Sequence, residues 1–470
     1  MRILLTGADG YIGRRLKRVL MGQAGITLRL MVRNRASLSS EIRSDIDIVQ
    51  ADVLKKETLD AALEGIDVAY YLIHGLARPN YRELDRQSAQ NFLDAAIRNN
   101  VKTIIYLGGL GEKSSASEHL LSRIETGEIL SSRPDKVRCL WFRAGVIIGS
   151  GSASFEIIRN LVQKLPIMIT PRWVQSRITP IGVDDVIGYL DDAKTLSGSQ
   201  NEMIDIGSEA MSYGELMLRT ASAMGLHRRL IPVPFLTPKL SSYWLTLFTP
   251  VPYSVASSLI EGLKSEVVMT NNRAEELFKR HPMGLEASVE KAIEEIRNHQ
   301  IISRWSDSGG GAWEVDHIHD IATAVFSDRR VLPLGDKSHE AVYKSFCAIG
   351  GGNGWFGYDW LWKVRGGIDK LLGGAGVNRG RRDSQSLRIG DSLDFWKVVD
   401  LVENERLLLY AQMKLPGSAW LEFKIHQGNL IQSAYFYPDG VSGRLYWYAL
   451  VPFHHLIFAN MAKKILERAL

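Results

Sequence analysis

The feature that most constrains this chain stands at its beginning, where a short apolar segment runs directly into a glycine-rich turn. Residues 2–6 (Arg-Ile-Leu-Leu-Thr) suit a buried parallel strand. The turn carries Gly7, Gly10 and Gly13, and apolar residues then recur at helical spacing. Gly7 permits a tight turn, Gly10 lets backbone N–H groups approach a ligand, and Gly13 lets the helix pack closely on the strand. This segment predicts a strand–turn–helix unit that holds phosphate at the helix N-terminus.

The spacing Gly-x-x-Gly-x-x-Gly resembles that of the short-chain dehydrogenase/reductase (SDR) superfamily, in its extended and atypical branches. The resemblance covers about residues 1–300 and is strongest to NmrA-like proteins and the NADPH-binding accessory subunit of respiratory complex I. It implies a doubly wound parallel Rossmann sheet (class α/β), with Asp9, Tyr11 and Ile12 beside the three glycines in a dinucleotide loop. This group includes reductases, redox-sensing regulators and structural subunits, so the fold leaves the activity open.

The residue after the second expected strand predicts which dinucleotide binds. That strand ends in Arg33, where an NAD-binding protein usually carries an acid for the ribose 2′-hydroxyl. An arginine suits a 2′-phosphate through charge-assisted hydrogen bonds, and Arg14, Arg15 and Arg35 would add to its field. We therefore favour NADP(H) over NAD(H). The alternative is that Arg33 is a solvated loop residue.

The resemblance places the other parts of the cofactor near later segments. Asp52 would accept a hydrogen bond from the adenine amine, and Val53 would pack on the adenine ring. Ile73 and His74 end the fourth expected strand and Gly108 follows the fifth, so these three residues would border the nicotinamide. Strands that alternate with helices in this part also predict a doubly wound parallel sheet.

The usual SDR catalytic pair is missing from this chain. A typical reductase carries Tyr-x-x-x-Lys on the helix after the fifth strand. Residues 1–300 hold no such pair, and the one formed by Tyr410 and Lys414 falls in a strand-like run. His119 and Arg123 stand at the matching place with the same helical spacing. One hypothesis makes His119 a proton donor and Arg123 an orienting cation; the other makes His119 a surface or capping residue of a site without SDR chemistry.

The composition changes near residue 305, since 8 of the 11 tryptophans lie in residues 301–470. We therefore assign residues 1–305 to the nucleotide-binding domain and 306–470 to a second domain. Four strand-like segments within 394–436 and a helical pattern from Phe453 to the end predict an antiparallel sheet and a long terminal helix.

The second domain resembles the α+β helix-grip fold of the START-like, polyketide-cyclase superfamily, in a module of unknown function often fused behind SDR domains. This resemblance implies an apolar ligand held between the sheet and the long helix. Tryptophans suit the wall of such a cavity, although ordinary core packing is the alternative. The candidates are Trp355, Trp360, Trp362, Trp396, Trp420 and Trp447.

Composition excludes several classes of protein. The formal net charge of +5 is spread over both parts, and neither is a nucleic-acid-binding block. Two cysteines, Cys139 and Cys347, cannot form a disulfide framework, which favours the cytoplasm. His317 and His319 have no third ligand at a defined spacing, so we expect no metal.

Prolines interrupt the apolar segment 240–260, so we expect no transmembrane helix there. The segment indicates a lid or docking surface, with peripheral membrane contact as the alternative.

These observations predict an NADP(H)-dependent oxidoreductase of the atypical SDR type that acts on a small, apolar carbonyl or alkene. The alternative is a non-catalytic NADP(H)-binding sensor or scaffold whose second domain binds a ligand. The sequence predicts neither the substrate, nor the reaction direction, nor the oligomeric state.

Overall fold

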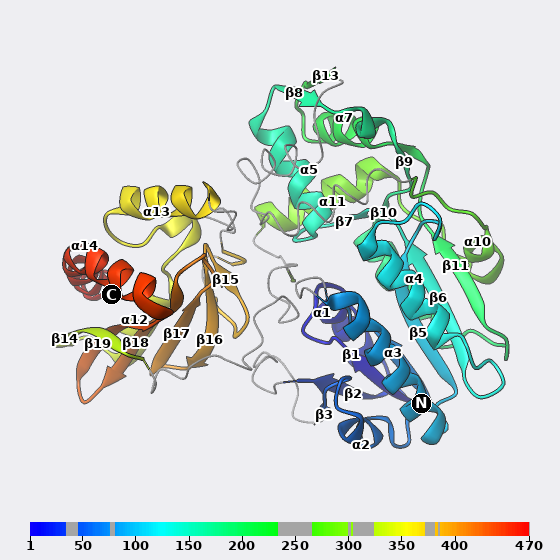
Figure 1. The fold of residues 1–470 in the computed structure, drawn as a ribbon, viewed down its shortest axis with the longest axis horizontal. Coiled ribbons are helices and arrows are strands. Elements are labelled where there is room, and N and C mark those ends of the chain that lie inside the picture. The colour runs from blue at the N-terminus through cyan, green and yellow to red at the C-terminus, as the bar shows by residue number, and fades with distance from the viewer. Residues whose placement is uncertain are drawn as a thin grey trace. The chain divides into compact units, whose positions relative to one another are not determined.

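The computed structural model describes residues 1–33, 46–75, 80–233, 266–298, 302–303, 324–371, 381–383 and 386–469. The chain divides into two compact units near residue 312 (Figure 1). The domain boundary predicted at residues 305 and 306 lies outside the described residues, as do Arg35, His317, His319 and the segment 240–260.

A parallel sheet of seven strands forms the centre of the first unit (Figure 1). Its spatial order is β11 (Glu202–Ile206), β6 (Arg138–Ala144), β5 (Thr103–Gly109), β4 (Val68–Tyr71), β1 (Arg2–Thr6), β2 (Thr27–Val32) and β3 (Asp47–Gln50). Ile3 of β1 lies opposite Leu28 on one side and Val68 on the other. The strand order therefore reverses between β1 and β4, and ligands of such sheets bind at the carboxyl ends of the strands near this reversal.

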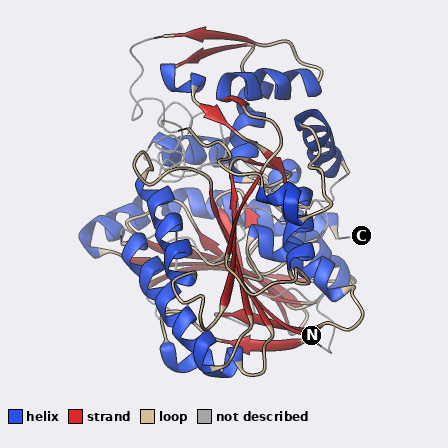
Figure 2. Cartoon of the chain, turned by 90° about the vertical axis from the view of Figure 1, so that its right-hand side faces the viewer, coloured by secondary structure: helices blue, strands red, loops and turns tan. Residues whose placement is uncertain are grey.

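Helices cover both faces of this sheet (Figure 2). Ile3 and Leu5 pack with α1 (Tyr11–Met21) and α6 (Val183–Ala193), whereas Leu4 packs with α3 (Tyr81–Arg98) on the other face. Successive side chains of a strand point to opposite faces, so the continuous apolar run of β1 is buried throughout. Four more helical segments pack around the sheet: η2 (Lys56–Thr58), α2 (Leu59–Leu63), α4 (Glu118–Leu130) and α10 (Arg273–Leu277). The predicted doubly wound parallel sheet is confirmed.

The first unit also contains short paired strands and further helices. The pairs are β7 (Ile147–Ile148) with β10 (Ile181–Gly182), β8 (Ile167–Thr170) with β13 (Arg229–Pro232), and β9 (Arg177–Ile178) with β12 (Met211–Ser212). The helices are η3 (Arg172–Gln175), α5 (Ala153–Lys164), α7 (Tyr213–Ala223) and α11 (Leu285–Arg297). Helix α7 contacts α5 and α11, and α11 contacts β7 and β10, so these elements form one attached layer.

The second unit is built on an antiparallel sheet, and its predicted α+β class is confirmed. The strand order is β14 (Phe326–Pro333), β19 (Asn429–Pro438), β18 (Gly417–His426), β17 (Arg406–Ala411), β16 (Trp396–Val402) and β15 (Ser392–Leu393). Its helices are α12 (His339–Cys347), η7 (Gly351–Asn353), α13 (Asp359–Leu371) and α14 (Gly440–Arg468).

The terminal helix begins well before its predicted start at Phe453, and Pro452 lies inside it. A proline interrupts the hydrogen-bond ladder of a helix, which is why the sequence pattern indicated a start after this residue. Packing holds the earlier half in place, because the ring of Trp447 stacks against Phe326 and Phe436 of the sheet.

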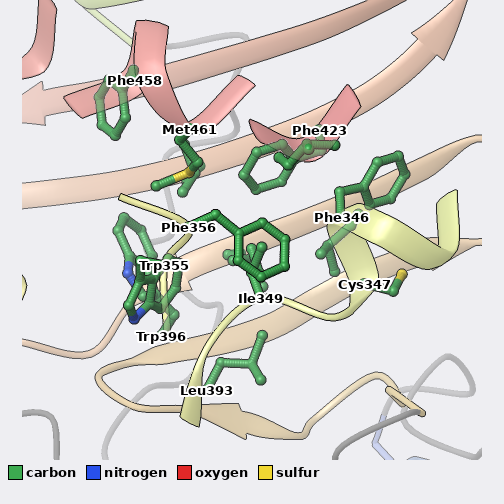
Figure 3. Packing of buried hydrophobic residues seen from close by; sticks show 14 of the residues in the cluster. Phe346, Cys347, Ile349, Trp355, Phe356, Leu393, Trp396, Phe423, Phe458 and Met461 are labelled. Atoms are coloured by element: carbon green, nitrogen blue, oxygen red, sulfur yellow. The ribbon is translucent and has the colours of Figure 1, made fainter. Parts of the chain in front are cut away.

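The candidate tryptophans do not share one wall. Trp355, Trp362 and Trp396 are buried in the core around Phe395, with the Trp355 and Trp362 ring centroids 5.0 Å apart. Figure 3 shows Trp355 and Trp396 side by side within this cluster. Trp420 belongs to a separate small cluster with Leu408 and Tyr410, and Trp360 is 62% exposed. Ordinary core packing, the stated alternative, describes Trp355, Trp362 and Trp396, and contact of any of the six tryptophans with a ligand stays a prediction.

Candidate functional site

The glycine turn between β1 and α1 has the geometry that its three glycines predicted. Gly7 has a positive φ of 62°, and a Cβ there would lie 2.8 Å from the carbonyl oxygen of Leu72 at the end of β4. A Cβ on Gly13 would lie 2.0 Å from the carbonyl oxygen of Gly7. Neither position can hold a side chain, so both glycines bring the start of α1 close to the end of the sheet.

Gly10 leaves room where a phosphate would bind. It is the N-cap residue of α1, and no described side chain caps this helix end. A Cβ on Gly10 would meet only the carbonyl oxygen of Gly7, at 3.1 Å, within 4 Å. The N–H groups of Tyr11 and Ile12 lie in the first turn, where no helix carbonyl reaches them. Together with the helix dipole, this arrangement fits the pyrophosphate of a dinucleotide.

Two other residues of this region do not face the expected phosphate. The Tyr11 hydroxyl lies against Gly149, where a Cβ would be 2.7 Å from it, so only the backbone of Tyr11 serves the loop. Arg15 is 2% exposed at its side chain and pairs with Glu295 at 2.9 Å. Because Glu295 neutralises that charge, the predicted contribution of Arg15 to a 2′-phosphate field is wrong. Arg14 donates from Nε to the carbonyl oxygen of Asp9 at 2.8 Å, within the turn itself.

The residues expected around the adenosine lie at the ends of β2 and β3. Arg33 is exposed directly after β2. Asp52 is half-buried, and one of its carboxylate oxygens accepts the backbone N–H of Leu54 at 3.0 Å. Val53 is buried, and its carbonyl accepts the amide of Asn91 at 2.9 Å. These positions are compatible with the predicted roles, which stay predictions.

Three expected nicotinamide neighbours lie at the ends of β4 and β5. Ile73 is partly buried and His74 is exposed, both just beyond β4. Gly108 lies within the end of β5, where a Cβ would come 2.6 Å from Nε1 of Trp141. The packing of Trp141 therefore accounts for this glycine without any ligand.

His119 and Arg123 come together on α4 beside these strand ends. Nε of Arg123 donates to Nε2 of His119 at 3.4 Å, and the rings of His74 and His119 lie 6.4 Å apart. Burial and the adjacent guanidinium lower the pKa of His119 to about 3. His119 is therefore a neutral imidazole at physiological pH, and the predicted delivery of a proton from its charged form is disfavoured.

Sequence reasoning missed Asp85, on the first half of α3. Its carboxylate accepts the backbone N–H of Gly75 at 2.9 Å and the hydroxyl of Ser122 at 2.7 Å. Burial raises the pKa of Asp85. Asp85 thus ties the segment after β4 to the helix that carries Arg123. An acid on the polar part of a helix gives no signal in the sequence, because its partners are remote.

The described ranges contain neither a cluster of metal-ligating groups nor a membrane-spanning helix. Within them, no three His, Cys, Asp or Glu side chains are placed to hold a metal ion. No helix there combines the length and apolar character needed to cross a bilayer.

Comparisons with known proteins agree with this geometry. Residues 7–131 match a family described as NAD(P)H-binding, and residues 321–461 match a family described as a protein of unknown function, DUF2867. The first unit thus has a Rossmann fold whose residues 7–131 match an NAD(P)H-binding family, and the second unit contains the match to DUF2867.

Individual relatives cover only parts of this chain or show the fold alone. The auxiliary protein GraX of Staphylococcus aureus is 28% identical over 128 residues, which span 25% of this chain and 40% of that protein. A nucleoside-diphosphate-sugar epimerase from S. aureus superposes with a TM-score of 0.51 at 17% identity. A triphenylmethane reductase from Citrobacter sp., in complex with NADP(H), gives the same two values. Each structure is matched over its whole length and covers 62% of this chain.

Proposed function

We propose that this protein is an NADP(H)-dependent oxidoreductase that acts on a small, apolar carbonyl or alkene in the cytoplasm. One observation carries the proposal: Gly10 opens the N-terminus of α1 toward the reversal point of a parallel sheet, with Gly7 and Gly13 holding the turn. When bound there, the cofactor would supply or accept a hydride. No nucleic-acid partner belongs to this proposal.

The chain's own residues would bind and orient the two reactants. The N–H groups of Tyr11 and Ile12 would donate to the pyrophosphate, and the exposed guanidinium of Arg33 would pair with the 2′-phosphate. Preference for NADP(H) over NAD(H) follows from this charge, because NAD(H) carries only a neutral 2′-hydroxyl where NADP(H) carries an anionic phosphate.

His119 would orient the substrate as a neutral hydrogen-bond donor. Because Nε2 accepts from Arg123, the ring proton belongs on Nδ1, which is then the donor. A donor fixed in this way positions a carbonyl oxygen and stabilises the negative charge that develops on it. Arg123 is the positioning residue, because its hydrogen bond sets the tautomer of His119, whose pKa is lowered by burial and by the charge of Arg123.

Cofactor titration tests the first half of the proposal. Binding of NADPH and NADH to the full chain should differ by at least about tenfold, and Arg33→Ala should remove most of that difference. Arg133→Ala is the matched control, because Arg133 is also an exposed arginine but lies in the connection before β6, away from the carboxyl ends of the strands. A wild-type preference for NADH would overturn the assignment of Arg33.

A carbonyl and alkene screen that follows NADPH oxidation tests the second half. His119→Ala should lower kcat by about 100-fold, while NADPH affinity stays unchanged. The wild-type rate should show no titration near pH 6.5, because burial, together with the charge of Arg123, lowers the pKa of His119. Unchanged turnover in His119→Ala would remove this residue from catalysis.

A second candidate is a non-catalytic NADP(H)-binding sensor or scaffold. Two observations favour it: residues 1–300 contain no Tyr-x-x-x-Lys pair, and the matched relative GraX is named an auxiliary protein. In this case the second unit, if START-like, would bind an apolar ligand whose presence is coupled to the cofactor. Tight, slowly exchanging NADPH without turnover of any substrate would support the sensor over the enzyme.

A further inference from the structure

Helix α13 of the second unit exposes apolar side chains along one face. Trp360 is 62% exposed, Val364 53%, Ile368 47% and Leu371 75%. Their spacing of three or four residues places them on one side of the helix. The opposite side of α13 packs against the core of the unit, where Trp362 is buried. The outward side of α13 is thus apolar without taking part in the core.

Helix α14 carries a second exposed stripe of the same kind. Val441 is 74% exposed, Leu445 66% and Tyr448 62%, again three or four residues apart. Between these positions, Trp447 turns toward the sheet and stacks on Phe436. The stripe therefore faces away from the sheet that α14 covers.

A direct contact joins the two helices. Nη2 of Arg365, on α13, donates to the hydroxyl of Tyr446, on α14, at 3.2 Å. Figure 1 shows both helices, in yellow and red, within the second unit. The α13 stripe (Trp360, Val364, Ile368 and Leu371) and the α14 stripe (Val441, Leu445 and Tyr448) are together called the α13–α14 apolar surface.

The charges around this surface are mostly positive. Lys363 is exposed on α13 and Arg444 is exposed on α14, whose residues 440–466 contain no Asp or Glu; the exposed Asp439 precedes this helix. One of the two acids of α13, Asp369, is fully buried and accepts the N–H of Lys414 at 2.8 Å. The other, Asp359, stands at the helix N-terminus and accepts the N–H of Trp355. The surface therefore attracts an anionic partner.

We propose that the α13–α14 apolar surface lies on an anionic lipid membrane. Apolar side chains flanked by lysine and arginine, with tryptophan and tyrosine among them, are typical of helices that lie in the membrane interface. A second copy of the chain fits less well, because an antiparallel pairing centred on the α14 stripe would bring the Arg444 side chains of the two copies together. This proposal is independent of the proposed enzyme function.

Cosedimentation of the full chain with vesicles tests the proposal. Vesicles of phosphatidylcholine with phosphatidylglycerol should bind the protein about tenfold or more tightly than phosphatidylcholine alone, and added salt should weaken the binding. Val364→Glu should reduce binding by about tenfold, because it places an acid at the lipid surface. Val331→Glu is the matched control. Val331 is a valine that is 52% exposed, but it lies on β14, outside both stripes.

The other outcomes overturn the proposal. No sedimentation with anionic vesicles would mean that another part of the chain or another partner covers this surface. Equal losses for Val364→Glu and Val331→Glu would remove α13 from binding. A change of oligomeric state in Val364→Glu without vesicles would assign the surface to a second copy. Leu445→Glu repeats the test on α14, and circular dichroism establishes that each variant is folded.

Discussion

Two glycine-rich loops precede helices in this chain, and they use their backbone N–H groups in different ways. In residues 7–13, before α1, the N-cap Gly10 has no side chain and the first turn of the helix stays open. In residues 350–357, before α13, Asp394 accepts the N–H of Gly351 at 3.1 Å and Asp359 accepts the N–H of Trp355 at 2.8 Å.

The difference teaches that glycine content alone does not make an anion site. The second loop also needs its glycines, since Gly350 and Gly351 have positive φ angles of 85° and 60°. Two carboxylates nevertheless occupy its donors, and a phosphate there would meet the negative charge of the buried Asp394, whose side chain also accepts Nε1–H of Trp355. The N–H groups at the start of α1 can therefore bind a ligand, whereas those of the second loop bind carboxylates of its own unit.

The largest effect is expected from Gly13→Ala. The new Cβ would lie 2.0 Å from the carbonyl oxygen of Gly7, a backbone atom that cannot move without opening the turn. NADPH affinity should fall by about 100-fold, as measured by fluorescence titration. Gly352→Ala is the control from the other loop, because its Cβ would meet nothing within 4 Å. Unchanged affinity in Gly13→Ala would show that this turn does not hold the cofactor.

Asp394→Ala should destabilise the second glycine-rich loop. Asp394 is 4% exposed, and its removal takes the acceptor away from the backbone N–H of Gly351 and from the buried indole Nε1–H of Trp355. The free energy of unfolding of the second unit should fall by about 2–3 kcal/mol in a denaturant titration. Asp394→Asn keeps an acceptor and should lose less. A fall in NADPH affinity without loss of stability would contradict the separation of the two loops.

Gly10→Ala should weaken cofactor binding while disturbing the fold less than Gly13→Ala. A Cβ here is 3.1 Å from the carbonyl oxygen of Gly7 and occupies the open side of the turn. We expect about tenfold weaker NADPH binding, equivalent to about 1.4 kcal/mol, and a smaller fall in melting temperature than in Gly13→Ala. If affinity stays the same, the phosphates do not approach the chain at Gly10.

The smallest effect concerns acid stability in the second unit. Burial lowers the pKa of His454 to about 4, so its folded form binds fewer protons than the unfolded chain between pH 6.5 and 4. Stability is therefore lost as the pH falls through this window. His454→Phe should lose about 1 kcal/mol less than the wild type between pH 7 and pH 5, in paired denaturant titrations. His426→Phe is the control at an exposed histidine. Its free energy of unfolding should fall between pH 7 and pH 5 by as much as that of the wild type.

Local spacing predicted more of the fold than of the site. The strand at Arg2–Thr6 and the turn that follows were predictable, because burial on both faces demands a continuous apolar run. The start of α14 was not, because Pro452 obscures it while Trp447 holds the helix through contacts with other strands.

At the site, residue types were predictable but not their electrostatic state. The pairing of His119 with Arg123 follows from helical spacing, yet the low pKa of His119 depends also on burial. The sequence indicated that Arg15 adds to the positive field around a 2′-phosphate. In the structure its charge is paired with Glu295, a residue remote in the chain. Asp85 gave no signal, because its partners Gly75 and Ser122 come from other elements.

By itself the sequence determined two kinds of sheet, a glycine turn suited to a dinucleotide, and a change of composition near residue 305, since each depends on neighbouring residues and their spacing. Only the tertiary structure decided which glycine loop keeps its donors, because the carboxylate of Asp394 reaches Gly351 from another part of the chain. It also decided that α13 and α14 leave apolar faces outward, since exposure depends on which side the core has already covered.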